Sequence, residues 1–145
     1  MKATEIKITY HPKIKASERP KVHSSEQCFK LLMPFYEEII DYREFSFAIL
    51  LSSSNGVLGV HKISEGGISS TLMDVRNVFQ AAIKSNAAGV IISHNHPSGN
   101  IKPSESDIRL TQKMQEAGKI MDIALLDHLI LTSEAYYSFA DNGKL

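Results

Sequence analysis

The chain has 145 residues, of which 43% are apolar and 22% are charged, the composition of a globular domain able to bury its own core. Its 16 basic and 16 acidic side chains cancel, which argues against a protein whose main task is to neutralise nucleic-acid phosphates. The single Cys28 excludes an internal disulfide, and no apolar run has the length of a membrane span or a signal peptide. We therefore expect a cytoplasmic domain.

The first residues predict a strand followed by an arm. Charged or polar and apolar residues alternate over residues 5–10 (EIKITY), which is typical of a short strand. Residues 11–20 are basic, bounded by prolines and without a period, which predicts a loop or extended arm. We expect two regions: an N-terminal strand and arm over residues 1–23, and one folded domain over residues 24–145.

A helix and a hairpin are predicted next. Ser24 begins a capping-box pattern for a helix, which Pro34 should kink or split near its middle. The nearly continuous apolar run 45–53 predicts a buried strand. Asn55-Gly56 is a strong hairpin signal and leads into a partner strand over residues 57–64.

The second half alternates helices and strands. A regular apolar stripe predicts a helix from Asp74 to Gly89. The short apolar segment 90–93 predicts a buried strand that carries His94 at its end, and Ser104 caps the next helix. A last long strand is expected over residues 123–132. The order β, α, β-hairpin, α, β, α, β predicts a mixed sheet with helices packed against it.

One loop combines residue types that bind metals. Its spacing is His94-x-His96, seven residues, Ser104, two residues, Asp107. Residues two apart in an extended segment point to the same side, so both imidazoles can converge on one point. Asp107 lies in the first turn of the following helix, where the helix dipole favours a carboxylate. Two imidazoles and one carboxylate, with a fourth position open, are typical of catalytic zinc.

Each of these residues also has a simpler interpretation. A lone His-x-His pair at a strand end is more often a surface or core pair, and Asp107 alone is explained by capping. The combination on a constrained loop favours the metal site. Asp127 and His128 lie inside an apolar strand, where burial requires partners. They either orient a metal ligand or form a satisfied core pair.

The stretch HNHPSGNIKPSESD, residues 94–107, matches the His-x-His-x7-Ser-x2-Asp signature of JAMM (JAB/MPN) metalloproteases. The residues of this stretch, together with the downstream segments LLDHLIL and YYSFA, resemble the RadC group of that family. The resemblance runs from about Ser24 to the C-terminus. It implies an α/β (α+β) fold with a mixed, mostly antiparallel sheet flanked by helices, the JAB/MPN or cytidine-deaminase-like architecture.

The resemblance also implies roles for individual residues. His94, His96 and Asp107 match the Zn²⁺ ligands, and Ser104 matches the serine that hydrogen-bonds the water or the developing oxyanion. Glu44 occupies the place of the upstream catalytic glutamate, which moves the proton from the attacking water to the leaving amine.

An exposed ion pair with Arg43 is the alternative interpretation of Glu44. Glu65, beside Gly66-Gly67, is the rival candidate for the base, although a glutamate in that setting more often belongs to a turn.

Three functions follow. The leading hypothesis is a zinc-dependent metallopeptidase that cleaves a peptide or isopeptide amide in a peptide or protein substrate. The second is a DNA-repair-associated role of the RadC type. Longer relatives carry an N-terminal helix-hairpin-helix region for which there is no room before Ser24, and with zero net charge direct nucleic-acid binding is not favoured. The third is a metal-binding scaffold without turnover. The sequence names neither a particular substrate nor an oligomeric state.

Overall fold

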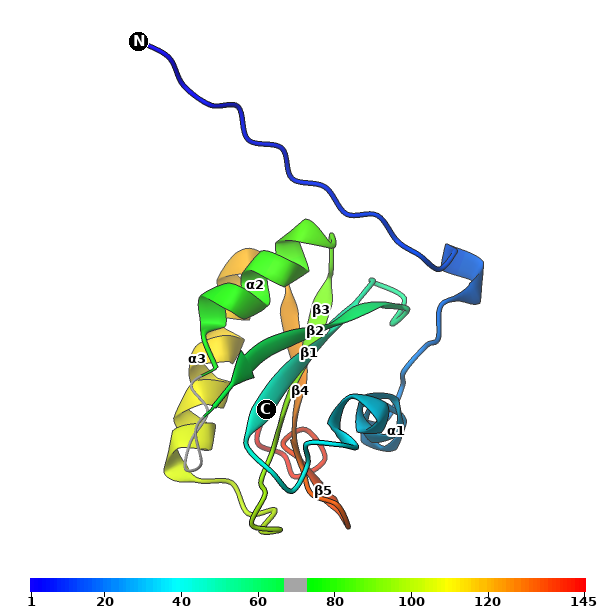
Figure 1. Cartoon of the computed structure of the whole chain (residues 1–145), viewed down its shortest axis with the longest axis vertical. Coiled ribbons are helices and arrows are strands. Elements are labelled where there is room, and N and C mark those ends of the chain that lie inside the picture. The colour runs from blue at the N-terminus through cyan, green and yellow to red at the C-terminus, as the bar shows by residue number, and fades with distance from the viewer. Residues whose placement is uncertain (67–72) are drawn as a thin grey trace.

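The computed structural model describes residues 1–66 and 73–145 as one sheet with helices on both faces (Figure 1). Its helices and strands occur in the following order: the short 3₁₀ helix η1 (Ala16–Glu18), α1 (Ser25–Tyr36), β1 (Phe45–Leu51), β2 (Val57–Glu65), α2 (Val75–Lys84), β3 (Gly89–Asn95), α3 (Glu105–Met121), β4 (Ala124–Leu131) and β5 (Tyr136–Ser138).

The five strands in the described parts of the chain form a mixed sheet in the order β2-β1-β3-β4-β5. β1 runs antiparallel to both β2 and β3, and β5 runs antiparallel to β4. Among the strand pairs of the described residues only β3–β4 is parallel, and α3 makes the crossover that this pair requires. The predicted fold class, a mostly antiparallel mixed sheet flanked by helices, is confirmed.

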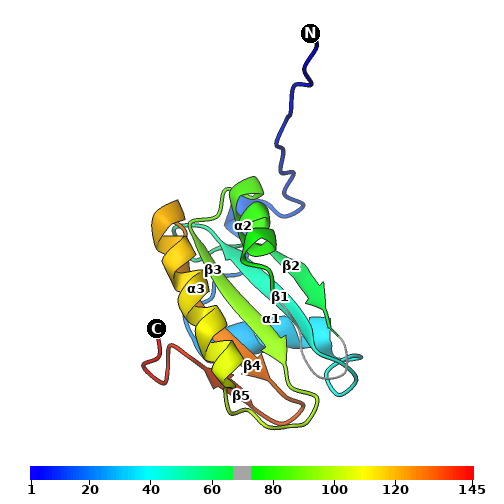
Figure 2. The same ribbon diagram turned by 90° about the vertical axis from the view of Figure 1, so that its left-hand side faces the viewer.

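Each face of the sheet has its own apolar core. α1 covers one face, where Leu32 and Tyr36 pack on Phe47 and Ile49 of β1. α2 and α3 lie side by side over the other face (Figure 2) and bury a second cluster. Because β1 and β3 are covered on both faces, their residues are buried without interruption, which explains the continuous apolar runs in the sequence.

The strand predicted for residues 5–10 does not form. This segment is extended and leaves the body of the molecule (Figure 1). Its Ile6 and Ile8 side chains are exposed. Tyr10 contacts the sheet by donating a hydrogen bond to the Leu58 carbonyl oxygen over 2.5 Å. The alternating pattern was present, but a strand also needs a ladder of backbone hydrogen bonds to a neighbour, and this segment has none among the described residues.

Two predicted helix features are also corrected. Pro34 does not split α1 near its middle; it lies in the last turn, and α1 continues to Tyr36. α2 ends at Lys84, five residues before Gly89, because Asn86 takes the left-handed conformation (φ 58°) that terminates the helix. Gly89 instead begins β3.

The predicted hairpin is present, with Asn55 left-handed (φ 60°) at the turn between β1 and β2. Within the described part of the chain, no helix has the length and apolar character needed to cross a membrane.

Candidate metal centre

The candidate metal centre lies where β3 ends and α3 begins. His94 is the penultimate residue of β3, and His96 follows the strand directly. Ser104 caps α3: its Oγ accepts a hydrogen bond from the Asp107 backbone N–H (3.1 Å), and Asp107 Oδ2 accepts one from the Ser104 N–H (2.7 Å). The capping box therefore fixes the Asp107 carboxylate at the helix start, beside the strand end.

The three predicted ligands converge. His94 Nε2 lies 2.9 Å from His96 Nε2 and 3.2 Å from Asp107 Oδ1, and His96 Nε2 lies 3.5 Å from Asp107 Oδ2. One ligand atom from each residue falls within 4.8 Å of the others. His94 is buried, and the side chains of His96 and Asp107 are 13% and 14% exposed, so the group lies just beneath the surface. Such a site leaves room for a water or a substrate atom.

The hydrogen-bond partners of His96 show which of its nitrogens is free. Its Nδ1 lies 2.6 Å from the Asn100 carbonyl oxygen, which can only accept, so Nδ1 carries the hydrogen. In the neutral ring Nε2 then presents a lone pair toward His94 Nε2 and the Asp107 carboxylate. Lone pairs this close repel one another unless a hydrogen or a metal ion lies between them. Two imidazole nitrogens and a carboxylate suit zinc.

Electrostatics agree with this interpretation. Burial raises the pKa of Asp107, but the hydrogen bonds that His94 and His96 donate from Nε2 when their rings are protonated outweigh it and hold that pKa well below its usual value. The hydrogen bond to Asp107 raises the pKa of His96, against desolvation, and the negative charge of Glu44 adds to this effect. The site therefore attracts positive charge and keeps its carboxylate ionised.

Glu44 lies at the edge of this group. It directly precedes β1, and Ser46 of β1 pairs with His94. The same antiparallel register, extended by two residues, puts Glu44 opposite His96, in agreement with its effect on the His96 pKa. Its backbone is fixed by a 2.8 Å hydrogen bond from the Gly66 N–H to its carbonyl oxygen.

Arg43 and Glu65, the residues of the two alternative interpretations, have other partners in the structure. Among the ion pairs of the described residues, none joins Glu44 to Arg43; the Arg43 guanidinium instead lies over the Tyr42 ring, 4.8 Å from its centroid. Glu65 is half-exposed and forms an ion pair with Lys62 (2.9 Å), which lowers its pKa. Of the Gly-Gly pair beside it, Gly67 lies outside the described residues.

Asp127 and His128 point to opposite faces of β4 and do not form a mutual pair of side chains. His128 is fully buried, with Nε2 2.9 Å from His94 Nδ1. Asp127 accepts hydrogen bonds from the Ser138 hydroxyl (2.6 Å) and the Ala140 N–H (3.0 Å), so it holds the C-terminal segment in place. The structure thus places His128 against a candidate ligand and Asp127 away from it.

Two residues near the site were not singled out as site residues from the sequence. Asn95, between the two histidines, is fully buried and bonds the segment that leads to Glu44. Thr111 lies one turn of α3 after Asp107 and contacts His128. Period-2 alternation could have flagged Asn95, because a residue between two inward histidines faces the opposite core, where an amide needs partners.

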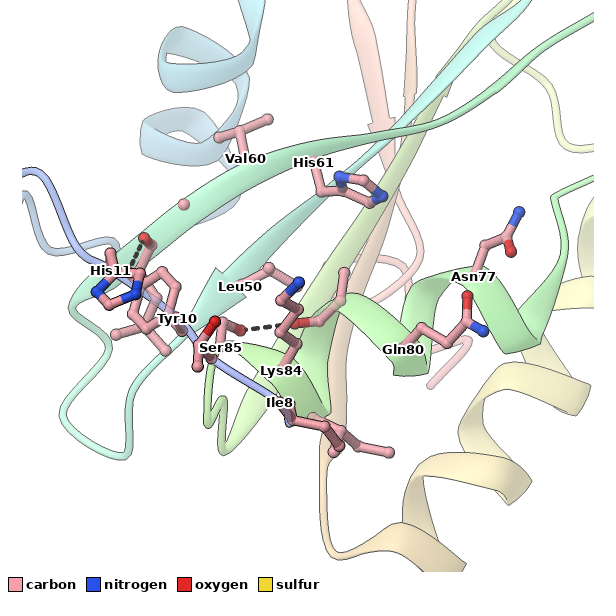
Figure 3. A pocket seen from close by; sticks show the side chains of 15 residues that line it. Ile8, Tyr10, His11, Leu50, Val60, His61, Asn77, Gln80, Lys84 and Ser85 are labelled. Atoms are coloured by element: carbon pink, nitrogen blue, oxygen red, sulfur yellow. Dashed lines mark hydrogen bonds between the residues drawn. The ribbon is translucent and has the colours of Figure 1, made fainter. Parts of the chain in front are cut away.

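A cavity of about 830 Å³ lies elsewhere, between the N-terminal arm, β2 and α2 (Figure 3). Its lining residues include Ile8 and Tyr10 of the extended N-terminal segment, Leu50, Leu58 and Lys84. Leu50 pairs with Gly59 at the end of β1 remote from the Ser46–His94 pair. The cavity is thus at the opposite end of the sheet from the candidate metal centre.

Comparison with known proteins agrees with the signature. The family model described as "RadC-like JAB domain" matches residues 22–144. A UPF0758 protein of Flavobacterium johnsoniae is 42% identical over 123 residues, 85% of this chain and 53% of the relative. A UPF0758 protein of Porphyromonas gingivalis is 36% identical over 135 residues, 92% of this chain and 59% of the relative.

These curated relatives are longer, and the chain spans between half and three fifths of their length. The match nevertheless covers both the sheet and the His-His-Asp cluster, which together allow a metal ion in a hydrolase-like fold. The chain belongs to the RadC-like JAB domain family.

Proposed function

We propose that this chain is a zinc-dependent hydrolase that cleaves a peptide or isopeptide amide. His94, His96 and Asp107 hold the metal, and Glu44 is the general base. The observation that carries the proposal is the convergence of two imidazole Nε2 atoms and an ionised carboxylate on one point just beneath the surface, with a further carboxylate beside His96. This is the ligand set of catalytic rather than structural zinc.

Bound zinc supplies a water of lowered pKa and polarises the substrate carbonyl. Glu44 takes one proton from the attacking water and delivers it to the leaving nitrogen as the C–N bond breaks, so the products are a carboxylic acid and an amine. Ser104 can serve the developing oxyanion, because its Oγ only accepts in the capping box and its own hydrogen stays available to donate.

Glu44→Gln tests the base. The amide cannot accept the proton, so hydrolysis should fall by about 100-fold or more while one zinc per chain is retained. Glu65→Gln is the matched control, since it neutralises a nearby exposed carboxylate that is paired with Lys62. We expect the control to keep the native rate. The substrates are fluorogenic peptides and peptides linked through a lysine ε-amide.

The possible outcomes separate the alternatives. A native rate for Glu44→Gln would exclude Glu44 as the base. Hydrolysis that resists a chelator would exclude metal catalysis. Zinc bound with every coordination position closed by protein, and no turnover of any amide, would favour the metal-binding scaffold.

A further inference from the structure

The second ring nitrogen of His94 begins a buried chain of hydrogen bonds. While Nε2 faces His96 and Asp107, Nδ1 lies 2.9 Å from Nε2 of His128 on β4, the parallel neighbour of β3. His128 is 0% exposed, so water cannot substitute for either of its partners. A neutral imidazole has one hydrogen, and the partner of one nitrogen decides the state of the other.

Thr111 determines where the hydrogen of His128 lies. The Thr111 Oγ1 is 2.7 Å from the Asp107 backbone carbonyl oxygen and 2.7 Å from His128 Nδ1. A carbonyl oxygen can only accept, so the single hydroxyl hydrogen of Thr111 is donated to Asp107. Oγ1 must then accept from His128, which places the His128 hydrogen on Nδ1.

The remaining hydrogens follow from this assignment. His128 Nε2 has only a lone pair to offer, so it accepts from His94 Nδ1–H. His94 Nε2 is then left with a lone pair directed at the candidate metal position. Without this chain the opposite state would be favoured, because the Asp107 carboxylate, 3.2 Å away, attracts a hydrogen on His94 Nε2.

The ring of His128 is also fixed in orientation. Phe139 stacks on it with ring centroids 4.7 Å apart and an interplanar angle of 8°. The Phe139 N–H donates to the His128 carbonyl oxygen over 3.0 Å, which ties the stacking residue to the same strand. A ring held in this way cannot turn to exchange its two nitrogens.

We propose that Thr111 and His128 are positioning residues that hold His94 with its hydrogen on Nδ1, so that Nε2 is available to a metal ion. The inference rests on the metal site of the proposed function, but not on turnover. The chain of hydrogen bonds links two candidate ligands. The Asp107 carbonyl oxygen orients the Thr111 hydroxyl, Thr111 fixes the hydrogen of His128 on Nδ1, and His128 fixes the hydrogen of His94 on Nδ1. Partners of this kind typically change metal affinity by about 10–100-fold.

The test uses the full chain labelled with ¹⁵N-histidine. Long-range ¹H–¹⁵N spectra at mildly alkaline pH distinguish Nδ1–H from Nε2–H in each ring, and competition with a chromophoric chelator gives the Zn²⁺ affinity. In the unmutated protein we expect His94 as the Nδ1–H form. In Thr111→Val we expect an Nε2–H population of His94 and about 10–100-fold weaker Zn²⁺ binding.

Two further variants isolate the hydroxyl. Thr111→Ser keeps it and should restore both the Nδ1–H form and the Zn²⁺ affinity. Ser85→Ala is the matched control: the Ser85 hydroxyl also donates to a helix carbonyl four residues earlier (Ala81, 2.8 Å), at the other end of the sheet. We expect it to leave His94 and the Zn²⁺ affinity unchanged.

An Nε2–H form of His94 in the unmutated protein would overturn the inference, and this measurement needs no variant to fold. Unchanged tautomer and Zn²⁺ affinity in Thr111→Val would overturn it as well. If the tautomers behave as expected and no amide is hydrolysed, the inference stands and the proposed hydrolase fails. If hydrolysis is chelator-sensitive but Thr111→Val changes neither the His94 tautomer nor the Zn²⁺ affinity, the proposed hydrolase stands and the inference fails.

Discussion

His94 and Asn95 are adjacent residues whose side chains serve opposite faces of β3. His94 faces α3, so Asn95 faces α1, where it is fully buried. Its Oδ1 accepts from the Phe45 N–H (2.7 Å), and its Nδ2 donates to the carbonyl oxygens of Ile40 (2.7 Å) and Arg43 (2.8 Å). All three bonds fix the segment from Ile40 to Phe45, which carries Glu44. Asn95 therefore couples the position of the proposed base to that of the ligands.

Asn95→Ala is expected to lower the free energy of unfolding by about 3 kcal/mol, because it leaves three backbone groups without partners in the core. Urea unfolding measures the change. Asn142→Ala is the control, since its Nδ2 donates one bond, to the Ser138 carbonyl oxygen, in an exposed residue. It should cost about 1 kcal/mol or less. Equal losses in the two variants would contradict the anchoring role.

Some residues of the candidate site can be recognised from short sequence patterns, and others depend on contacts between residues far apart in the sequence. His94, His96 and Asp107 could be identified from the sequence, because period-2 alternation and a capping box act within a few positions. The parts played by Asn95 and Thr111 depend on partners that are distant in sequence, Ile40 and His128. Spacing along one chain contains no information on such contacts.

At the scale of elements, α3 has to return to the sheet within a very short turn. Asp122 ends the helix in the left-handed conformation (φ 53°), and the Ile123 N–H donates to the Gly118 carbonyl oxygen (3.0 Å). A Cβ at Gly118 would lie 2.4 Å from the Ile123 carbonyl oxygen. The close approach of backbone to backbone therefore requires glycine at this position.

Gly118→Ala should destabilise the fold by about 2 kcal/mol, because the clash with a backbone atom exceeds the gain in helix propensity of about 1 kcal/mol. Gly59→Ala, in β2, is the comparison: a Cβ there meets nothing within 4 Å. We expect it to be neutral or slightly stabilising. Thermal unfolding of both variants measures the two changes in stability. An unchanged stability in Gly118→Ala would show that the α3–β4 turn can move to accept the added Cβ.

The elements differ in how well the sequence predicted them. The buried strands and the Ser104-capped helix were predicted because burial on two faces and capping leave clear patterns. The N-terminal strand was wrong because strand pairing is not a property of the segment alone. The end of α2 was misplaced because Asn86, rather than the more usual glycine, took the left-handed position.

For the whole molecule, the candidate site joins parts that would separate on unfolding. His94 belongs to β3, Asp107 to α3, and His96 to the loop between them. Zinc should therefore bind the folded chain and stabilise it by RT ln(1 + [Zn]/Kd), about 2.7 kcal/mol at a hundredfold excess over Kd. For a domain of this size that corresponds to roughly 10 °C in Tm.

The pH dependence has a definite sign. The raised pKa of His96 stabilises the metal-free fold fully below about pH 6.5, and this contribution is lost as pH rises through the folded-state pKa. The lowered pKa of Asp107 acts above about pH 4, and its contribution is lost as pH falls through the folded-state pKa. A proton on His96 competes with zinc, so zinc stabilisation should grow as pH rises past the His96 pKa.

Calorimetry of the full chain with excess zinc or with a chelator, at several pH values, tests this expectation. The zinc-dependent rise in Tm should be large at mildly alkaline pH, shrink toward pH values below about 6, and vanish on chelation. Asp107→Ala should abolish the rise by removing a ligand, whereas Glu44→Gln should keep it, since Glu44 is not among the converging ligand atoms. A rise in Tm that survives Asp107→Ala would place the bound zinc somewhere other than the end of β3.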